Sequence, residues 1–211
     1  MAGVFVVFEG GDGVGKSTQT ALLADWARAQ GREVLVTLEP GGSPIGEVLR
    51  DLVLNPAWGD VSPRAEALMY AADKAQHVYE VIRPALARGA LVISDRYVDS
   101  MLAYQGAGRD LDPERTEQIA RWATGDLRPD LTVVLDLDPA QGLATIAEKD
   151  RLEDAGADVH HRARQAFLAF AERDPQHYLV LPARLPVAEL AERIRVRLAS
   201  HLWGPAGTVE P

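Results

Sequence analysis

The sequence predicts an α/β fold in which helices cover both faces of a parallel sheet. Two features of the chain carry this prediction. Short apolar runs are unbroken rather than alternating with polar residues, which is typical of strands buried on both faces. Longer segments with helical periodicity separate these runs, as in consecutive βαβ units. The five predicted strands are Val4–Phe8, Glu33–Thr37, Leu91–Ser94, Leu131–Leu135 and Tyr178–Leu181.

The segments between the strands carry recognisable helix starts and ends. Gly31 and Gly89 stand where helix C-terminal caps are expected, and Pro113 and Pro139 stand near helix starts. Pro84 lies inside a long helical segment and predicts a kink or break there. The predicted helices are Lys16–Gln30, Ile45–Val53, Pro63–Arg88, Pro113–Thr124, Pro139–Glu148, Val159–Glu172 and Val187–Leu202.

Composition limits the classes of protein to which the chain can belong. Its 211 residues suit one compact domain, expected over residues 1–203, with a disordered tail at 204–211. The net charge of −9 repels polyanions and argues against nucleic-acid partners. Because the chain has no cysteine, disulfides and thiolate chemistry are excluded. His160 and His161 lack the spacing of a metal site and are interpreted as an exposed helix start. The N-terminus has no signal-peptide features and no apolar run reaches membrane length, so we expect a cytoplasmic protein without a membrane partner.

The sharpest motif is a glycine-rich loop between the first predicted strand and the first predicted helix. Glycines permit backbone angles and close approach that a side chain would block, and N–H groups at a helix start point toward bound phosphates. In the pattern G-x-x-x-x-G-K-[ST], the lysine reaches the β- and γ-phosphates and the hydroxyl is a ligand of Mg²⁺. The motif, which predicts binding of a nucleoside triphosphate, reads Gly10-Gly11-Asp12-Gly13-Val14-Gly15-Lys16-Ser17.

The rest of the sequence narrows the choice among P-loop proteins. A GTPase normally carries an N/T-K-x-D motif, and the chain has none, whereas its length suits a kinase for a nucleotide or another small metabolite. At the end of the third predicted strand, Asp95 is expected beside the P-loop, where it can hold Mg²⁺ through water. Arg96 offers a planar fork for a second phosphate, although a buried ion pair is the alternative for both residues. We therefore predict a P-loop kinase fold, a three-layer sandwich with a five-stranded parallel sheet flanked by helices.

Five segments occur in the order found in one kinase family. They are Phe8–Gln19, E-P-G-G-S-P-I-G-E at 39–47, Y-A-A-D-K-A-Q-H at 70–77, D-R-Y-V-D-S-M-L-A-Y-Q-G at 95–106 and D-R-L-E at 150–153. Together they resemble the thymidylate kinases, which phosphorylate dTMP with ATP, and the matches extend from Phe8 to about Ala183. The resemblance implies ATP and dTMP as substrates, Mg²⁺ as cofactor and a short lid at about 144–158. It also suggests a homodimer formed through the second, third and fourth long helices.

The resemblance also implies roles for individual residues on the donor side. The segment from Gly10 to Thr18 is expected to hold the phosphates of ATP, and Asp12 to face the sugar 3′-hydroxyl and the metal shell. Ser17 and Asp95 are the expected metal-binding residues. The expected catalytic residues are Lys16, Asp12, Arg96 and Arg151.

On the acceptor side, the resemblance implies that Arg50 and Arg96 clamp the phosphate. Tyr70 is expected to stack on the base, and Tyr104 to crowd the 2′ face of the sugar and so select deoxyribose. The alternative for the two tyrosines is a purely structural core position, and for Arg50 a surface position. The complete set of expected substrate-binding residues is Glu39, Arg50, Tyr70, Lys74, Arg96, Ser100, Tyr104 and Gln105, with Lys74 and Gln105 near the base edge.

Two departures from the family pattern affect the acceptor side. Leu38 stands where an arginine usually precedes E-P-G-G, and Lys74 stands where an arginine usually contacts the thymine carbonyl. Because lysine cannot reproduce a bidentate fork, weaker base selectivity is expected. The predicted function is phosphorylation of dTMP to dTDP. A kinase for another nucleoside or nucleoside monophosphate, and a weakly active ATP-binding homologue, are the alternatives.

A third departure concerns the lid. With Gly13 in the P-loop, the family pattern predicts a lid with several arginines, yet this lid supplies only Lys149 and Arg151. Three outcomes are open: these two cations suffice, Arg162 or Arg164 compensates, or the enzyme is slow. The sequence does not choose among them.

Overall fold

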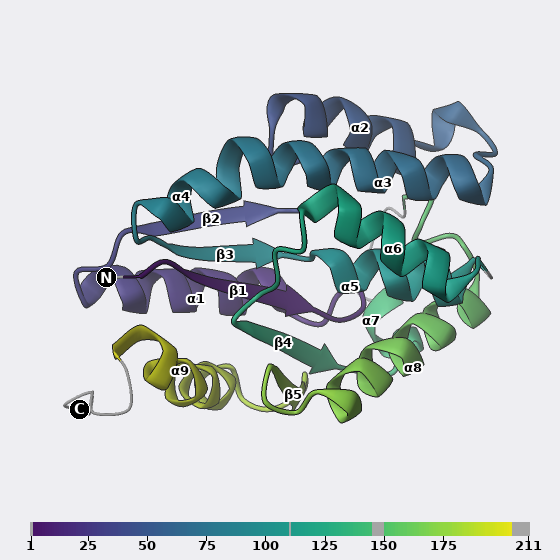
Figure 1. The fold of residues 1–211 in the computed structure, drawn as a ribbon. Coiled ribbons are helices and arrows are strands. Elements are labelled where there is room, and N and C mark those ends of the chain that lie inside the picture. The colour runs from purple at the N-terminus through teal and green to yellow at the C-terminus, as the bar shows by residue number, and fades with distance from the viewer. Residues whose placement is uncertain (1, 110, 145–149, 204–211) are drawn as a thin grey trace.

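The computed structural model describes residues 2–109, 111–144 and 150–203, with backbone alone for residues 202 and 203. Its centre is a five-stranded sheet in which all neighbouring strands are parallel, in the order β2-β3-β1-β4-β5 (Figure 1). The predicted fold class is confirmed, and each strand ends within one residue of its prediction. The strands are β1 (Val4–Glu9), β2 (Val34–Leu38), β3 (Leu91–Asp95), β4 (Leu131–Asp136) and β5 (Tyr178–Pro182).

Helices connect the strands, as the sequence predicted. Gly31 and Gly89 each follow a helix end with a positive φ angle, of 76° and 85°, which confirms both as caps. The helices are α1 (Lys16–Ala29), α2 (Pro44–Leu54), α3 (Pro63–His77), α4 (Arg83–Ala87), α5 (Val98–Met101), α6 (Pro113–Thr124), α7 (Pro139–Leu143), α8 (Ala157–Arg173) and α9 (Val187–Trp203), with a 3₁₀ turn at Pro56–Trp58.

Alternate residues of β1 face the two sides of the sheet. Val6 packs in one apolar cluster with residues of α1 and α9, such as Leu23. Val7 packs on the opposite side with Ile82 and residues of α4. Burial on both faces explains why the strands are unbroken apolar runs. The carboxyl ends of the strands point toward the same edge, where α5 and α7 lie (Figure 1).

The helix predicted over Pro63–Arg88 is interrupted. A π-helical turn, η2 (Val78–Ile82), separates α3 from α4 and ends just before Pro84. Proline has no N–H, and its ring clashes with the preceding turn of a regular α-helix. The wider π turn accommodates the ring, so the predicted break takes this form.

Residues 98–108 form helical structure that the sequence analysis did not predict. Here α5 continues into a second π-helical segment, η3 (Leu102–Gly108). Glycines inside η3 lower its intrinsic helix propensity, so contacts from elsewhere in the chain decide its conformation. The helix predicted over Pro139–Glu148 is present as α7 up to Leu143, and residues 145–149 lie outside the described residues.

Among the described residues, no helix combines the length and the apolar character needed to cross a membrane.

Candidate active site

The glycine-rich loop joins β1 to α1 with a backbone that favours glycine. Gly10, Gly13 and Gly15 have φ angles of 129°, 72° and 94°, and a Cβ on Gly10 would collide with the carbonyl oxygen of Leu135. Within the described residues, no side chain caps the start of α1, and its first turn contains no acidic residue. The N–H groups of this turn are therefore positioned to bind an anion.

Ser17 and Asp95 meet beside this loop, as the predicted metal site requires. Oγ of Ser17 lies 3.5 Å from Oδ2 of Asp95. Mg²⁺ is commonly held by one or two protein oxygens, with water and phosphate oxygens completing its shell. In residues 2–109, 111–144 and 150–203, no group of three or more acidic or histidine side chains could hold a metal ion by itself. The donor set therefore fits a Mg²⁺ ion that arrives with a nucleotide.

Lys16, Asp12 and Arg96 form one charged cluster at the loop. Nζ of Lys16 donates to the backbone oxygens of Gly11 at 2.8 Å and Gly10 at 3.3 Å, and it lies 4.0 Å from Oδ1 of Asp12. Arg96 donates to Gly10 O at 3.1 Å and pairs with Asp12. Burial and the nearby Arg96 charge lower the pKa of Lys16 to about 8. A bound polyphosphate would act in the opposite direction, because negative charge favours the ammonium.

A cavity of about 120 Å³ opens beside this cluster. Its wall is built from the loop after β2, from α2 and α3, from the turn after β3, from α5 and η3, and from residues 150, 152 and 153. All eight residues that the sequence analysis assigned to the substrate line it, together with Asp12: Glu39, Arg50, Tyr70, Lys74, Arg96, Ser100, Tyr104 and Gln105. The fold therefore brings the whole predicted set together, while the role of each residue stays a prediction.

The cavity wall also bears on the structural alternatives weighed for three of these residues. Tyr70 and Tyr104 are both buried, and both face the cavity. Arg50 is half-buried, with Nη1 donating to Pro40 O at 2.7 Å. The guanidinium of Arg96 lies 5.5 Å from the ring centroid of Tyr104. These four side chains thus form a cationic and aromatic surface suited to a nucleotide.

Comparison with known proteins identifies the family. The family model described as thymidylate kinase matches residues 8–194. A thymidylate kinase from Cutibacterium acnes is 57% identical over 96% of this chain and 99% of its own length. One from Clavibacter sepedonicus is 54% identical, covering 98% of this chain and 99% of its own. The crystal structure of a thymidylate kinase from Ehrlichia chaffeensis superposes with a TM-score of 0.77 at 28% identity, covering 93% of this chain and 98% of that one.

The chain belongs to the thymidylate kinase family. It is therefore a phosphotransferase, as the sequence predicted. The matched region contains the P-loop, both arginines of the acceptor cavity and the D-R-L-E segment. The family assignment thus covers every residue of the candidate site.

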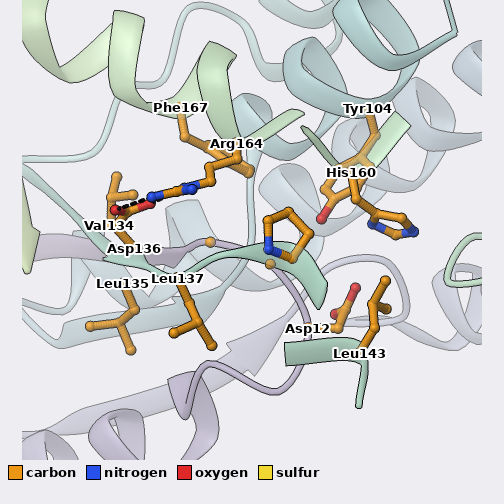
Figure 2. Close-up of a pocket in the computed structure, with 13 residues that line it drawn as sticks. Asp12, Tyr104, Val134, Leu135, Asp136, Leu137, Leu143, His160, Arg164 and Phe167 are labelled. Carbon is orange, nitrogen blue, oxygen red and sulfur yellow. Dashed lines mark hydrogen bonds and ion pairs between the residues drawn. The ribbon is translucent and has the colours of Figure 1, made fainter. Parts of the chain in front are cut away.

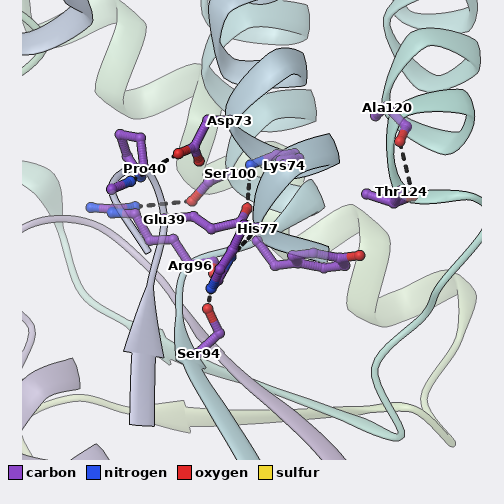
Figure 3. A network of polar contacts seen from close by, with 12 residues as sticks. Glu39, Pro40, Asp73, Lys74, His77, Ser94, Arg96, Ser100, Ala120 and Thr124 are labelled. Atoms are coloured by element: carbon purple, nitrogen blue, oxygen red, sulfur yellow. Dashed lines mark hydrogen bonds and ion pairs between the residues drawn. The ribbon is translucent and has the colours of Figure 1, made fainter. Parts of the chain in front are cut away.

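In this member of the thymidylate kinase family, Lys74 is held by a buried acid. Its Nζ lies 2.6 Å from Oε2 of Glu39, whose Oε1 is 2.8 Å from Nδ1 of His77 (Figure 3). Burial by itself would raise the pKa of Glu39, but Lys74 and His77 outweigh this effect and lower the pKa. An ammonium has three N–H donors, so the pair fixes the direction of Lys74 and leaves donors for the cavity.

Glu66, which the sequence analysis missed, supports the acceptor cavity without lining its described wall. This fully buried acid on α3 accepts from Nε2 of Gln105 at 3.0 Å, from Nε of Arg109 at 3.2 Å and from Nη2 of Arg151 at 2.6 Å. It therefore joins η3 to the D-R-L-E segment. An acidic residue one helical turn before Tyr70, on the same face of the helix, is the sequence signal that could have identified it.

Arg151, expected to be catalytic, is directed at Glu66 rather than at the phosphate-binding cluster. Its Nε and Nη2 also donate to Val53 O, at 2.9 and 2.6 Å. Its neighbours Asp150 and Leu152 line the acceptor cavity, but among the described residues of that wall Arg151 is absent. In this structure Arg151 links the D-R-L-E segment to Glu66 of α3 and Val53 of α2. Its catalytic role stays a prediction.

The two arginines that might replace a lid cation are both hydrogen-bonded within the described residues, although Arg164 lines a small cavity together with Gly10, Gly11 and Asp12 of the P-loop. Arg162 donates to the backbone oxygens of Ala107 and Gly108, at 3.0 and 2.6 Å. Arg164 forms a fork with the carboxylate of Asp136, at 2.6 and 2.9 Å (Figure 2). Lys149 lies outside the described residues. Within the described part of the lid, no arginine is directed at the P-loop.

The interpretation of His160 as part of an exposed helix start is wrong. The helix begins at Ala157, and His160 is buried, with Nε2 3.1 Å from Glu153 O. His160 and Tyr104 line a small cavity beneath the P-loop that Asp12 also lines (Figure 2). The packing of α8 against η3, which the sequence did not reveal, buries this side chain.

Proposed function

We propose that this kinase transfers the γ-phosphoryl group of Mg²⁺-bound ATP to dTMP, forming ADP and dTDP. The observation that carries the proposal is the single cavity in which all eight expected acceptor residues meet, beside the anion-binding loop. Membership of the thymidylate kinase family supports the acceptor and the reaction. We assign the P-loop to ATP and the adjoining cavity to dTMP.

On the donor side, the amides of the P-loop and Lys16 bind the polyphosphate. Ser17 and Asp95 would hold Mg²⁺, which neutralises phosphate charge when bound. The buried position of Lys16 places its charge where water screens it little. This arrangement supports stabilisation of the charge that develops on the transferred group.

On the acceptor side, Arg96 and Arg50 orient the phosphate of dTMP. That phosphate is already anionic, so the chemistry requires positioning rather than a strong general base. The pairing of Arg96 with Asp12 shares the guanidinium between the acceptor cavity and the P-loop. Asp12 thereby links the two halves of the site. Burial by itself would raise the pKa of Asp12, but the charges of Arg96 and Lys16 outweigh this effect and lower the pKa. Asp12 therefore stays ionised.

A coupled assay of ADP release tests the proposal directly. Acceptors dTMP, dUMP, dCMP and dGMP are compared at fixed Mg²⁺ and ATP, with Lys16→Ala as the inactive control. We expect dTMP to give the highest kcat/KM. Equal or higher kcat/KM for dCMP or dGMP would overturn the choice of acceptor. Tight ATP binding without acceptor-dependent ADP release would favour an inactive ATP-binding homologue.

We further propose that the chain forms a homodimer through α2, α3 and α6. Large apolar side chains are exposed on all three helices, including Val48, Leu68 and Trp122. Such side chains on adjacent helices are typical of a surface covered by a second subunit. Light scattering should report a dimer that Leu68→Glu converts to monomer. Val196→Glu, on the exposed surface of α9, is the matched control and should leave the dimer intact.

A further inference from the structure

Glu9 is a buried carboxylate that none of the roles above uses. It is the last residue of β1, directly before the P-loop, and it is 0% exposed. Its Oε1 accepts from the N–H groups of Tyr97 at 2.9 Å and Ser100 at 3.1 Å, and its Oε2 accepts from Ser100 Oγ at 2.6 Å. Three donors from one turn therefore converge on this carboxylate.

Ser100 extends these contacts to Arg96. The Ser100 hydroxyl donates to Glu9. Its oxygen accepts from Nη1 of Arg96 at 3.1 Å, a contact visible in Figure 3. The same guanidinium donates to Gly10 O and pairs with Asp12. Its direction is therefore set by Ser100 of α5 and by two residues of the P-loop, with the Tyr104 ring 5.5 Å away.

The backbone at Arg96 adds a reason for such an anchor. Its φ angle is 69°, in the left-handed region that residues other than glycine rarely adopt. Such a conformation persists where surrounding contacts fix it. Ser94 Oγ donates to Arg96 O at 2.8 Å, and Glu9 binds the N–H of Tyr97 directly after it. Contacts on both sides of Arg96 thus hold the turn.

We propose that Glu9 is a positioning residue for acceptor binding: through Ser100 and the turn that begins at Tyr97, it holds Arg96 in the orientation that meets the acceptor phosphate. The inference rests on the proposed function, which places that phosphate at Arg96. Glu9 is absent from the described wall of the acceptor cavity. It lines a separate cavity of about 620 Å³, together with Asp99, so it acts on the acceptor through its neighbours.

Steady-state kinetics of Glu9→Gln, with dTMP and ATP varied in turn, test the proposal. Burial and the charge of Asp99 raise the pKa of Glu9 to about 7, so all variants are assayed more than one pH unit above this value, where Glu9 is ionised. Under these conditions glutamine keeps the size of the side chain and an acceptor for the N–H groups, but it loses the charge that binds the Ser100 hydroxyl. We expect KM for dTMP to rise about ten-fold, the loss typical of one hydrogen bond to a charged group. KM for ATP should change less than two-fold. A general structural defect would instead raise both KM values or lower kcat alone.

Asp99→Asn is the matched control. Asp99 lines the same cavity as Glu9 and accepts from Tyr178 Oη at 2.6 Å, but within the described residues its carboxylate makes no hydrogen bond to Ser100 or Arg96. Removing its charge should leave KM for dTMP within two-fold of the wild-type value. A ten-fold rise in this control would show that any lost charge in the cavity suffices, and the proposal would be overturned.

A double-mutant cycle with Ser100→Ala tests the route through Ser100. If Glu9 acts through Ser100, the two substitutions together should raise KM for dTMP little more than either does alone. Additive effects, or an unchanged KM in Glu9→Gln, overturn the proposal. Thermal unfolding shows whether each variant folds. If Glu9→Gln does not fold, Ser100→Ala alone tests the route, and an unchanged KM for dTMP in that variant would overturn the proposal. The cycle uses whichever acceptor gives the highest kcat/KM in the panel above. If that acceptor is not dTMP, the proposed function is contradicted, but the role of Glu9 can still be tested.

Discussion

The P-loop cluster and the D-R-L-E segment both carry an arginine expected to be catalytic, but they hold it differently. Arg96 is bound by backbone oxygen and by Asp12, within the site where two phosphates would meet. Arg151 is bound by Glu66 and Val53 O and is absent from the described wall of the acceptor cavity. A sequence motif can place an arginine near a site, but the groups that bind the guanidinium determine where this guanidinium points. We therefore expect the two regions to respond differently to mutation.

Removal of the P-loop ammonium should have the largest effect. Lys16→Ala should lower kcat by about 10³-fold, because a buried charge directed at the transferred group is lost. Single-turnover ADP formation measures this directly. The free energy of unfolding should change little, because burial and the charge of Arg96 lower the pKa of Lys16, so the folded state disfavours its charge and this offsets the lost hydrogen bonds. A loss below ten-fold would contradict the assignment of the donor site.

Replacement of the Arg96 fork should rank second. Arg96→Lys keeps the charge but loses the planar pair of donors, and kcat/KM for dTMP should fall by about 10²-fold. KM for ATP, measured in the same assay, serves as the internal control. If the lysine variant retained full kcat/KM, point charge alone would explain the role of Arg96.

Arg151 should show the reverse balance of effects. Because its partner Glu66 is fully buried, Arg151→Ala should lower the free energy of unfolding by about 2 kcal/mol, while kcat falls by at most about ten-fold. Urea denaturation and steady-state kinetics measure the two quantities. A loss of kcat near 10³-fold with unchanged stability would show that Arg151 swings into the site during turnover, and the distinction drawn here would fail.

The smallest effect concerns two neighbouring acids: Glu39 is paired with a cation, whereas Asp73 accepts from the Gly41 N–H through Oδ1. Glu39 is paired with Lys74, whereas Oδ2 of Asp73 has no hydrogen-bond partner among the described residues. Burial, followed by the charge of Glu39, raises the pKa of Asp73 to about 6. The folded state then holds the proton more tightly than the unfolded state. The contribution of Asp73 to stability should decrease as pH rises from about 4 to 6.

Asp73→Asn removes this titration. Compared with wild type, its free energy of unfolding should depend less on pH between 4 and 6, by the order of 1 kcal/mol. Chemical denaturation at several pH values measures the difference. An identical pH dependence in the two proteins would show that Asp73 is ionised throughout this range.

Much of the candidate site follows from the sequence because its signals are local. The P-loop glycines, the end of β3 and the E-P-G-G loop each combine a backbone requirement with a chemical group over a few residues. The carboxyl ends of parallel strands share an edge, so Asp95 could be placed beside Ser17 before any coordinates. Glu9 was missed because a single acid at the end of an apolar strand carries no local pattern. Glu66 was missed because its position one helical turn before Tyr70 does not by itself identify its partners. Their partners lie in other segments of the chain.

By itself, the sequence determined the strands, most helices and the phosphate-binding loop, because apolar periodicity and glycine stereochemistry act over short distances. Only the tertiary structure decided that Lys74 pairs with Glu39, that Arg151 pairs with Glu66 and that residues 102–108 form a π-helical segment. Each of these outcomes depends on which residues, distant in the sequence, the fold places within contact distance of a buried charge or a backbone N–H. A buried polar group requires a partner, and the sequence does not name that partner.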